Sequence, residues 1–223
     1  MAAAGLAAEA RALKARLRQA LDQHDESSRV RLHRAVSWLL RAGQEEEDPD
    51  ARFLFLWIAF NAAYGGEFGN EQRGRALLAT YFARILALDG AGVLHAALFR
   101  TYSGPVRTLL ANRYVFAPFW KGLRERDAGE RWKASFDRAS RRAMRALVDK
   151  DTATVLAIVF DRLYVLRNQL VHGGATHGSK VNRAQVRDGA RLLQALVPPC
   201  ITLMLEHPDC DFGPIAWPVL PDA

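Results

Sequence analysis

The chain has 223 residues, of which half are hydrophobic, and its formal net charge is +7 at pH 7. These values exclude a disordered chain and indicate one domain with a sizeable core. The excess of arginine and lysine favours an anionic partner, with nucleic acid before a membrane surface, although many proteins that bind neither are also basic.

The first predicted elements are amphipathic helices. Apolar residues recur at helical spacing at Leu6, Ala10, Leu13, Leu17 and Leu21. This pattern predicts a helix to about Gln23. Ser27 and Ser28 can cap a second helix, which ends near Gly43. An acidic loop, 45–50, follows, and its last carboxylate can cap a third helix.

The third helix, 53–64, is apolar on all sides, so we expect it to be the buried centre of a bundle that stops at Gly65 and Gly66. It encloses Asn61 among aromatic and aliphatic side chains. A buried amide without a hydrogen bond costs about 1–3 kcal/mol. Asn61 therefore either bonds a backbone carbonyl in the core or supports the motif described below.

The middle of the chain has helical patterns of uneven regularity. Amphipathic stretches run from Asn70 or Glu71 to Leu88 and from Gly90 to Tyr102. The irregular pattern of 104–122 predicts short helices and loops.

A strongly patterned helix, 130–148, comes next and carries an arginine stripe on one side. The arginine stripe consists of Arg131, Arg138, Arg141, Arg142 and Arg145. A solvated face is one interpretation. The other is a surface that follows RNA, because arginines without interleaved acids repel one another unless phosphates or partner carboxylates neutralise them.

A long apolar segment from about 152 ends in the run RNQLVHGG. At about 100° per residue, Arg167 falls within an apolar arc, while Asp161, Asn168 and His172 share a narrower face. A guanidinium on an apolar face is costly unless it meets a partner or an anion. The carboxylate, amide and imidazole can be that partner, or can share a ligand with it. The glycine pair ends the helix, since glycine accepts the left-handed conformation.

The C-terminal part is predicted to be a loop, 173–180, a helix from about Asn182 to Glu206 and an extended tail, 208–223. Pro198 and Pro199 should kink or divide that helix. No segment has a strand pattern, so we predict an all-α fold with one helical domain over 1–206 and a proline-rich tail over 207–223.

The cysteines, the N-terminus, the longest uncharged run and the histidines bear on the location of the protein and on its possible membrane and metal partners. Cys200 and Cys210 form no CxxC motif, and the charged N-terminus lacks a secretory signal, so we expect a cytoplasmic location. The longest nearly uncharged run, 192–205, is too short to cross a bilayer, and no membrane partner is expected. His172, His177 and Cys200 lack a recognisable zinc spacing, so no metal site is expected.

The run Arg-Asn-x-x-x-His-Gly at the end of an apolar helix resembles the signature of the HEPN superfamily, which includes Apea-like members. The aromatic-rich run 56–64 also resembles a helix of HEPN-like chains. The resemblance implies a helical bundle whose core helices lie at about 28–64 and 151–206, with additional N-terminal and inserted helices. In some HEPN subfamilies a tyrosine that a partner modifies stands where this chain has Gly174, so that regulation is not implied.

Many HEPN proteins are metal-independent RNA endonucleases that work as homodimers. The resemblance implies that Arg167, Asn168 and His172 are catalytic and that no cofactor is needed. From their positions, Asn61 and Asp161 are the residues expected to support them, although Asp161 can instead pair with Arg162 or a neighbouring helix. RNA is the implied substrate, and the arginine stripe would bind it. Links of HEPN proteins to toxin–antitoxin and phage-defence systems further imply a protein antitoxin or regulatory partner. The alternative is a catalytically inactive HEPN-like module that binds RNA or protein.

Overall fold

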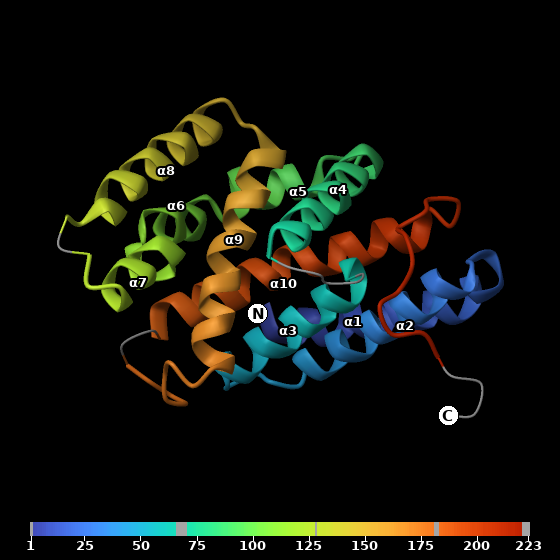
Figure 1. Ribbon diagram of the computed structural model, residues 1–223. Helices are drawn as coiled ribbons and strands as arrows, with labels where there is room; N and C mark the ends of the chain where they lie inside the picture. The colour runs from blue at the N-terminus through green and yellow to red at the C-terminus, as the bar shows by residue number, and fades with distance from the viewer. Residues whose placement is uncertain (1, 66–70, 128, 181–182, 220–223) are drawn as a thin grey trace. The chain divides into compact units, whose positions relative to one another are not determined.

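The structure is a computed structural model that describes residues 2–65, 71–127, 129–180 and 183–219 (Figure 1). Over these ranges every regular element is a helix and none is a strand, which confirms the all-α class. Two compact units are formed, by Met1–Ala91 with Leu193–Ala223 and by Gly92–Leu192. No single helix in the described ranges has both the length and the apolar composition needed to cross a membrane.

The first unit contains four helices and the C-terminal part of a fifth. They are α1 (Ala2–Ala20), a 3-10 turn (Leu21–Gln23), α2 (Glu26–Ala42), α3 (Pro49–Tyr64), α4 (Glu71–Leu88) and α10 (Arg183–Glu206). The predicted apolar face of α1 is buried from Leu6 to Leu17, and α2 packs against both α1 and α3. The predicted helices are therefore present, with α4 described from Glu71 because Asn70 lies outside the described residues.

The prediction that α3 is buried on all sides is wrong. Phe53, Leu56 and Phe60 are fully buried, whereas Phe55 and Asn61 on the other side are only half-buried. That side is covered by long side chains of α2: Trp38 stacks on Phe55 at 5.7 Å and the Arg41 guanidinium lies 4.7 Å from the Phe55 ring centre. Because the sequence of α3 is apolar on every side, it does not show which side of the helix is only partly covered.

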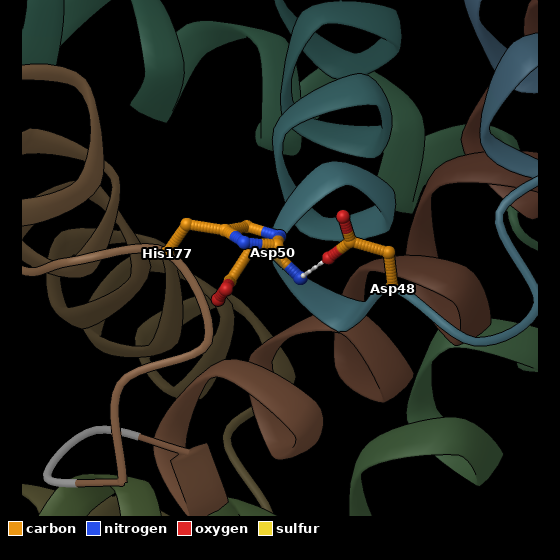
Figure 2. Close-up of side chains that lie close together, drawn as sticks. All are labelled: Asp48, Asp50 and His177. Atoms are coloured by element: carbon orange, nitrogen blue, oxygen red, sulfur yellow. Dashed lines mark hydrogen bonds between the residues drawn. The ribbon is translucent and has the colours of Figure 1, made fainter.

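The N-terminal caps lie before the residues that the sequence suggested. Asp25, rather than the serine pair, caps α2, and its carboxylate accepts hydrogen bonds from the backbone N of Ser28 at 2.9 Å and from its hydroxyl at 2.8 Å. Asp48, rather than Asp50, caps α3, and its Oδ1 accepts from the backbone N of Asp50 at 2.9 Å and of Ala51 at 3.1 Å (Figure 2). A cap must precede the N–H groups that it binds by two or three residues.

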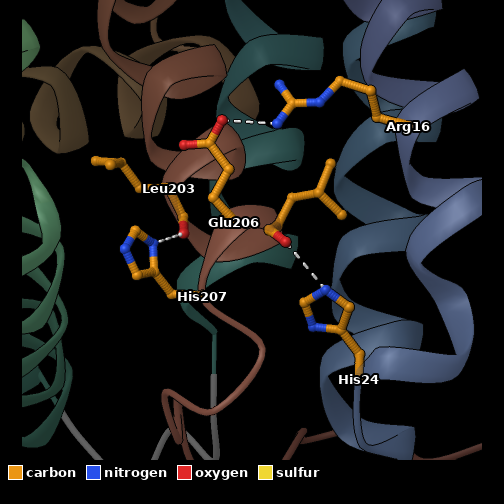
Figure 3. A network of polar contacts seen from close by, with 6 residues as sticks. Arg16, His24, Leu203, Glu206 and His207 are labelled. Carbon is orange, nitrogen blue, oxygen red and sulfur yellow. Dashed lines mark hydrogen bonds and ion pairs between the residues drawn. The ribbon is translucent and has the colours of Figure 1, made fainter.

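Side chains also satisfy the C-terminal end of α10 (Figure 3). A ring nitrogen of the buried His24 lies 3.2 Å from the carbonyl oxygen of Leu205, and Nδ1 of His207 lies 2.8 Å from that of Leu203. Since a carbonyl can only accept, both rings donate. These carbonyls belong to the last turn, where no backbone N–H follows to bind them.

A buried arginine holds the C-terminal tail. Arg31 is 1% exposed; its Nη1 donates to the carbonyls of Ala63 at 3.0 Å and Gly65 at 2.7 Å. Its Nη2 donates to those of Gly213 at 3.0 Å and Pro214 at 3.2 Å. One guanidinium thus joins the end of α3 to the tail, which is non-helical over 208–219 as predicted.

The last helix is not divided at its prolines, where the sequence predicts a kink or a division. Pro198 and Pro199 both lie inside α10, which continues to Glu206. Proline removes a helical hydrogen bond, a cost that burial can offset. Val197, Cys200 and Ile201 around the pair are almost completely buried.

The second unit contains the remaining helices. They are α5 (Val93–Ala96), a π-helical turn (Ala97–Thr101), α6 (Ser103–Ala111), the 3-10 turn η3 (Arg113–Val115), α7 (Ala117–Arg124), α8 (Arg131–Val148), α9 (Thr152–Val171) and the start of α10. Helix α9 packs against α6, η3 and α8, and α8 also packs against α7. The short helices predicted for 104–122 are thus α6 and α7, of which α6 packs against α9 and α7 packs against η3 and α8.

Helix α9 ends in the glycine pair that the sequence identified. Gly173 has φ +69°, its backbone N donates to the carbonyl of Leu170 at 3.3 Å, and that of Gly174 donates to Gln169 at 2.7 Å. These two bonds and the left-handed residue form a Schellman cap.

Helix α8 ends in the same motif with a lysine in the left-handed position. Lys150 has φ +52°, its N donates to Leu147 at 3.4 Å, and that of Asp151 donates to Ala146 at 2.9 Å. A side chain makes this conformation unfavourable, whereas glycine adopts it without strain.

Substitutions at these two caps should therefore change stability in opposite directions. Gly173→Ala should lower the free energy of unfolding by about 1 kcal/mol, and Lys150→Gly should raise it by about 0.5 kcal/mol after the added chain entropy is counted. Urea unfolding followed by circular dichroism measures both. Changes of the same sign would contradict the assignment of both caps.

Candidate functional site

The motif helix α9 is fixed at its start by Asp151. The carboxylate accepts a hydrogen bond from the backbone N of Thr154 at 3.0 Å. Hydrogen bonds from the side chain and backbone of Thr154 hold the pKa of Asp151 below its usual value. With the Schellman cap at the other end, the motif lies on a helix that is closed at both ends.

Core contact along α9 stops at Leu166. Val155, Leu156, Val159, Phe160, Leu163 and Leu166 are 0% exposed. From Arg167 to His172 each residue is half-buried or exposed. The last turn and a half of α9 therefore extends beyond the core, and it carries the whole motif.

This end point explains the partial exposure of Arg167. Its direction does continue the apolar arc, but the side chain is only half-buried because the core ends before it. The fully buried arginine of α9 is Arg162, which is 1% exposed. The helical angle places a side chain around the axis, but it cannot tell where along the axis the covering elements end.

The motif side chains have the following contacts. Nη1 of Arg167 donates to Oδ1 of Asn168 at 3.0 Å. The backbone N of His172 donates to the carbonyl of Asn168 at 3.0 Å, so the amide residue contacts both of the others. The His172 side chain is exposed, and Asp161, on the same side of α9, is half-buried. The guanidinium and the amide are thus hydrogen-bonded to each other, and the exposed imidazole follows Asn168 by one helical turn.

Gln169 anchors this end of the helix, a role that the sequence did not reveal. Its Nε2 donates to the carbonyl of Tyr114 in η3 at 2.7 Å. Nε1 of Trp120 in α7 donates to the same carbonyl, also at 2.7 Å. The motif turn is therefore attached to η3 although it lies outside the core. A second amide inside the motif, next to Asn168, was the available signal.

Two apolar side chains accompany the motif on the surface. Tyr164 is 40% exposed and Val171 is 50% exposed. At 100° per residue both point to the same side of α9 as Asn168. Single exposed apolar residues are ordinary, whereas these two lie on the same side of α9 as the polar motif.

All members of the arginine stripe are exposed on α8. Its two ends have acidic partners: Arg131 pairs with Asp127 at 3.1 Å and Arg145 with Asp149 at 3.5 Å. The three central members, Arg138, Arg141 and Arg142, form no ion pair with another described residue. The stripe is therefore a solvated basic face that is neutralised at its ends only.

The candidate residues are divided between the two units. The motif, Asp161 and the arginine stripe lie in the second unit, whereas Asn61 lies in the first. Asn61 is half-buried rather than enclosed, and its support of the motif stays a prediction.

Fold and site define an all-α protein with an Arg-Asn-x-x-x-His motif exposed at the end of a buried helix. The chain matches no protein-family model, no curated protein and no solved structure.

The cap of the motif helix gives a pH-dependent prediction. Asp151→Ala should lower the free energy of unfolding by about 1 kcal/mol at neutral pH. Because the folded-state pKa of Asp151 is lowered, its stabilisation is complete above the unfolded-state pKa and is lost as pH falls through the folded-state value. The difference between the two proteins should therefore shrink in acid, as measured by urea unfolding at several pH values. Asp151→Asn keeps a neutral cap and should remove most of the pH dependence of the cap's contribution. If the difference in unfolding free energy between the wild type and Asp151→Ala does not change with pH, this role is contradicted.

Proposed function

We propose that this protein is a metal-independent endoribonuclease of the HEPN type, with a composite site formed by two copies of the motif in a homodimer. The observation that supports the proposal most is the exposure of His172 beside the hydrogen-bonded pair Arg167–Asn168, on a turn that the core does not cover. Side chains that only stabilised the fold would lie on the buried part of α9.

The proposed chemistry uses these three side chains. His172 accepts the proton of a ribose 2′-hydroxyl, since imidazole titrates near neutral pH. The 2′-oxygen forms a bond to phosphorus and the bond to the 5′-oxygen breaks, which leaves a 2′,3′-cyclic phosphate. The second copy's histidine donates a proton to the leaving 5′-oxygen. Arg167 stabilises the extra negative charge on phosphorus-bound oxygens, and Asn168 holds Arg167 in place.

A dimer is part of the proposal because one motif supplies a single histidine. In an isologous contact the same patch meets itself, so one short motif contributes two histidines and two arginines. Tyr164 and Val171 are exposed beside the motif and provide apolar surface for such a contact. Their burial against a second copy would bring the two motif turns together.

Substitution of the motif tests the catalytic roles. His172→Ala and Arg167→Met should each reduce RNA cleavage by about 10²–10⁴-fold, the usual contribution of a general base or of a charge-stabilising group. Methionine keeps the aliphatic stem of the arginine, so the fold should persist. Cleavage of a mixed RNA in EDTA, with analysis of the product ends, measures the effect.

Two controls make this test decisive. His33→Ala removes an exposed histidine of α2 and should leave cleavage unchanged. Light scattering should give twice the chain mass of 24.8 kDa at micromolar concentrations. An active protein that is monomeric would contradict the composite site, and wild-type protein that never cuts RNA would contradict the nuclease.

Charge reversal on the arginine stripe tests RNA binding. Changing Arg138, Arg141 and Arg145 to Glu should weaken binding about equally for all sequences and lower the slope of log K against log salt by about 2, since each single-strand phosphate contact contributes about 0.7. The matched control reverses Arg11, Lys14 and Arg18, which are exposed on α1. Equal losses in both triple variants would mean that net charge, rather than the stripe, attracts RNA.

A non-catalytic interaction module is the second candidate. The observation that favours it is the internal Arg167–Asn168 hydrogen bond, which partners the guanidinium without any ligand. In that case His172→Ala would bind the same RNA or protein partners as the wild type, and neither would cleave.

A further inference from the structure

Among the described residues Arg162 is a second buried arginine, and it lacks the acceptors that its charge requires. It lies in the middle of α9 and is 1% exposed. Its Nε and Nη1 have no hydrogen-bond partner among the described residues. Burial lowers the pKa of this guanidinium, and the neighbouring Asp161 opposes the shift. Arginine nevertheless keeps its charge in proteins, so the unpaired donors are a lasting cost.

Aromatic rings replace hydrogen bonds around this side chain. The guanidinium carbon lies 4.3 Å from the ring centre of Phe116 and 5.8 Å from that of Phe136 in α8. The two rings contact each other edge to face at 5.3 Å. Rings attract a cation through their faces, but they offer no acceptor comparable to an oxygen for Nε–H and Nη1–H.

The buried guanidinium of Arg31 provides a comparison, because its acceptors are backbone oxygens of the chain itself. It is as deeply buried as Arg162, and four backbone carbonyls accept hydrogen bonds from its two Nη atoms, so that Nε alone has no partner among the described residues. Arg162 has the same burial but rings in place of carbonyls. The difference indicates that acceptors for Arg162 come from outside the chain.

Another unsatisfied polar atom lies on α8, one helical turn from Phe136. The buried Oγ of Ser140 in α8 also has no hydrogen-bond partner among the described residues. Ser140 follows Phe136 by one helical turn, so it points to the same side of α8 as the ring that contacts Arg162. Two cationic donors and one hydroxyl donor thus lie on the inner side of the α8–α9 pair, which suits an oxyanion.

Helix α8 is the element that can move to admit a ligand. Along its 18 residues only Ala143 and Ala146 are fully buried. Elements that bury little apolar surface open locally at low free energy. The arginine stripe on the outer face of α8 would raise the concentration of anions near it.

We propose that Arg162 is the centre of a concealed binding site for a small oxyanion, which accepts hydrogen bonds from Arg162 and Ser140 between α8 and α9. Phosphate and carboxylate groups share this chemistry. The site is separate from the exposed motif and does not depend on ribonuclease activity.

Thermal unfolding of the full chain with inorganic phosphate or acetate, against chloride of equal ionic strength, tests the proposal. The wild type should melt at a higher temperature with one of these oxyanions, since a ligand of the folded state stabilises it. A response to phosphate assigns a phosphate group as the ligand, and a response to acetate alone assigns a carboxylate. Arg11→Met, which removes an exposed arginine of α1 outside the arginine stripe, should respond like the wild type.

Arg162→Met should lose the response and, in chloride, melt no lower than the wild type, because replacing a buried unpaired charge by an apolar side chain of similar length is neutral or stabilising. Ser140→Ala should keep the fold and weaken the oxyanion affinity several-fold. An equal response in wild type and Arg162→Met would mean adventitious binding to surface arginines. Two outcomes would overturn the proposal and make Arg162 a purely structural cation–π contact. In the first, the wild type shows no response to either oxyanion. In the second, Arg162→Met fails to fold and Ser140→Ala binds as the wild type does.

Discussion

The burial of α9 as far as Leu166, and no farther, is the constraint on which the candidate site depends. Up to Leu166 the helix is held by the elements of its own unit, so its direction is fixed. From Arg167 to His172 no residue of α9 is fully buried, yet Gln169 and the Schellman cap at Gly173 keep the last turn helical. The polar motif is therefore held in place by these contacts and is also accessible to solvent. Binding and catalysis both require this combination.

The two buried arginines illustrate two solutions to one electrostatic problem. Arg31 satisfies its charge with carbonyls from the end of α3 and from the tail, and in doing so attaches an otherwise irregular segment. Arg162 is surrounded by rings, which offset part of the lost hydration but accept no strong hydrogen bond. In the first arrangement both Nη atoms bind oxygens of the chain and Nε alone has no partner among the described residues, whereas in the second neither Nε nor Nη1 has one.

Local features of the fold were predictable where the responsible groups are close in sequence. The left-handed end of α9 followed from its glycine pair, whereas the same cap at Lys150 was invisible because lysine carries no preference for that conformation. The caps of α2 and α3 were assigned to the wrong residues, since several acids and serines stand together and only the backbone path decides which one precedes the first free N–H groups.

By itself, the sequence determined the all-α class, the positions of the long helices, the exposed arginine stripe and the glycine end of the motif helix, because these depend on periodicity and on the chemistry of neighbouring residues. Tertiary structure alone decided that α3 is covered incompletely, that Asn61 is half-buried, that Arg162 rather than Arg167 is the buried arginine, and that Gln169 reaches the carbonyl of Tyr114. Each of these depends on where one helix stops covering another. That position is set by contacts between residues far apart in the chain, which helical periodicity does not contain.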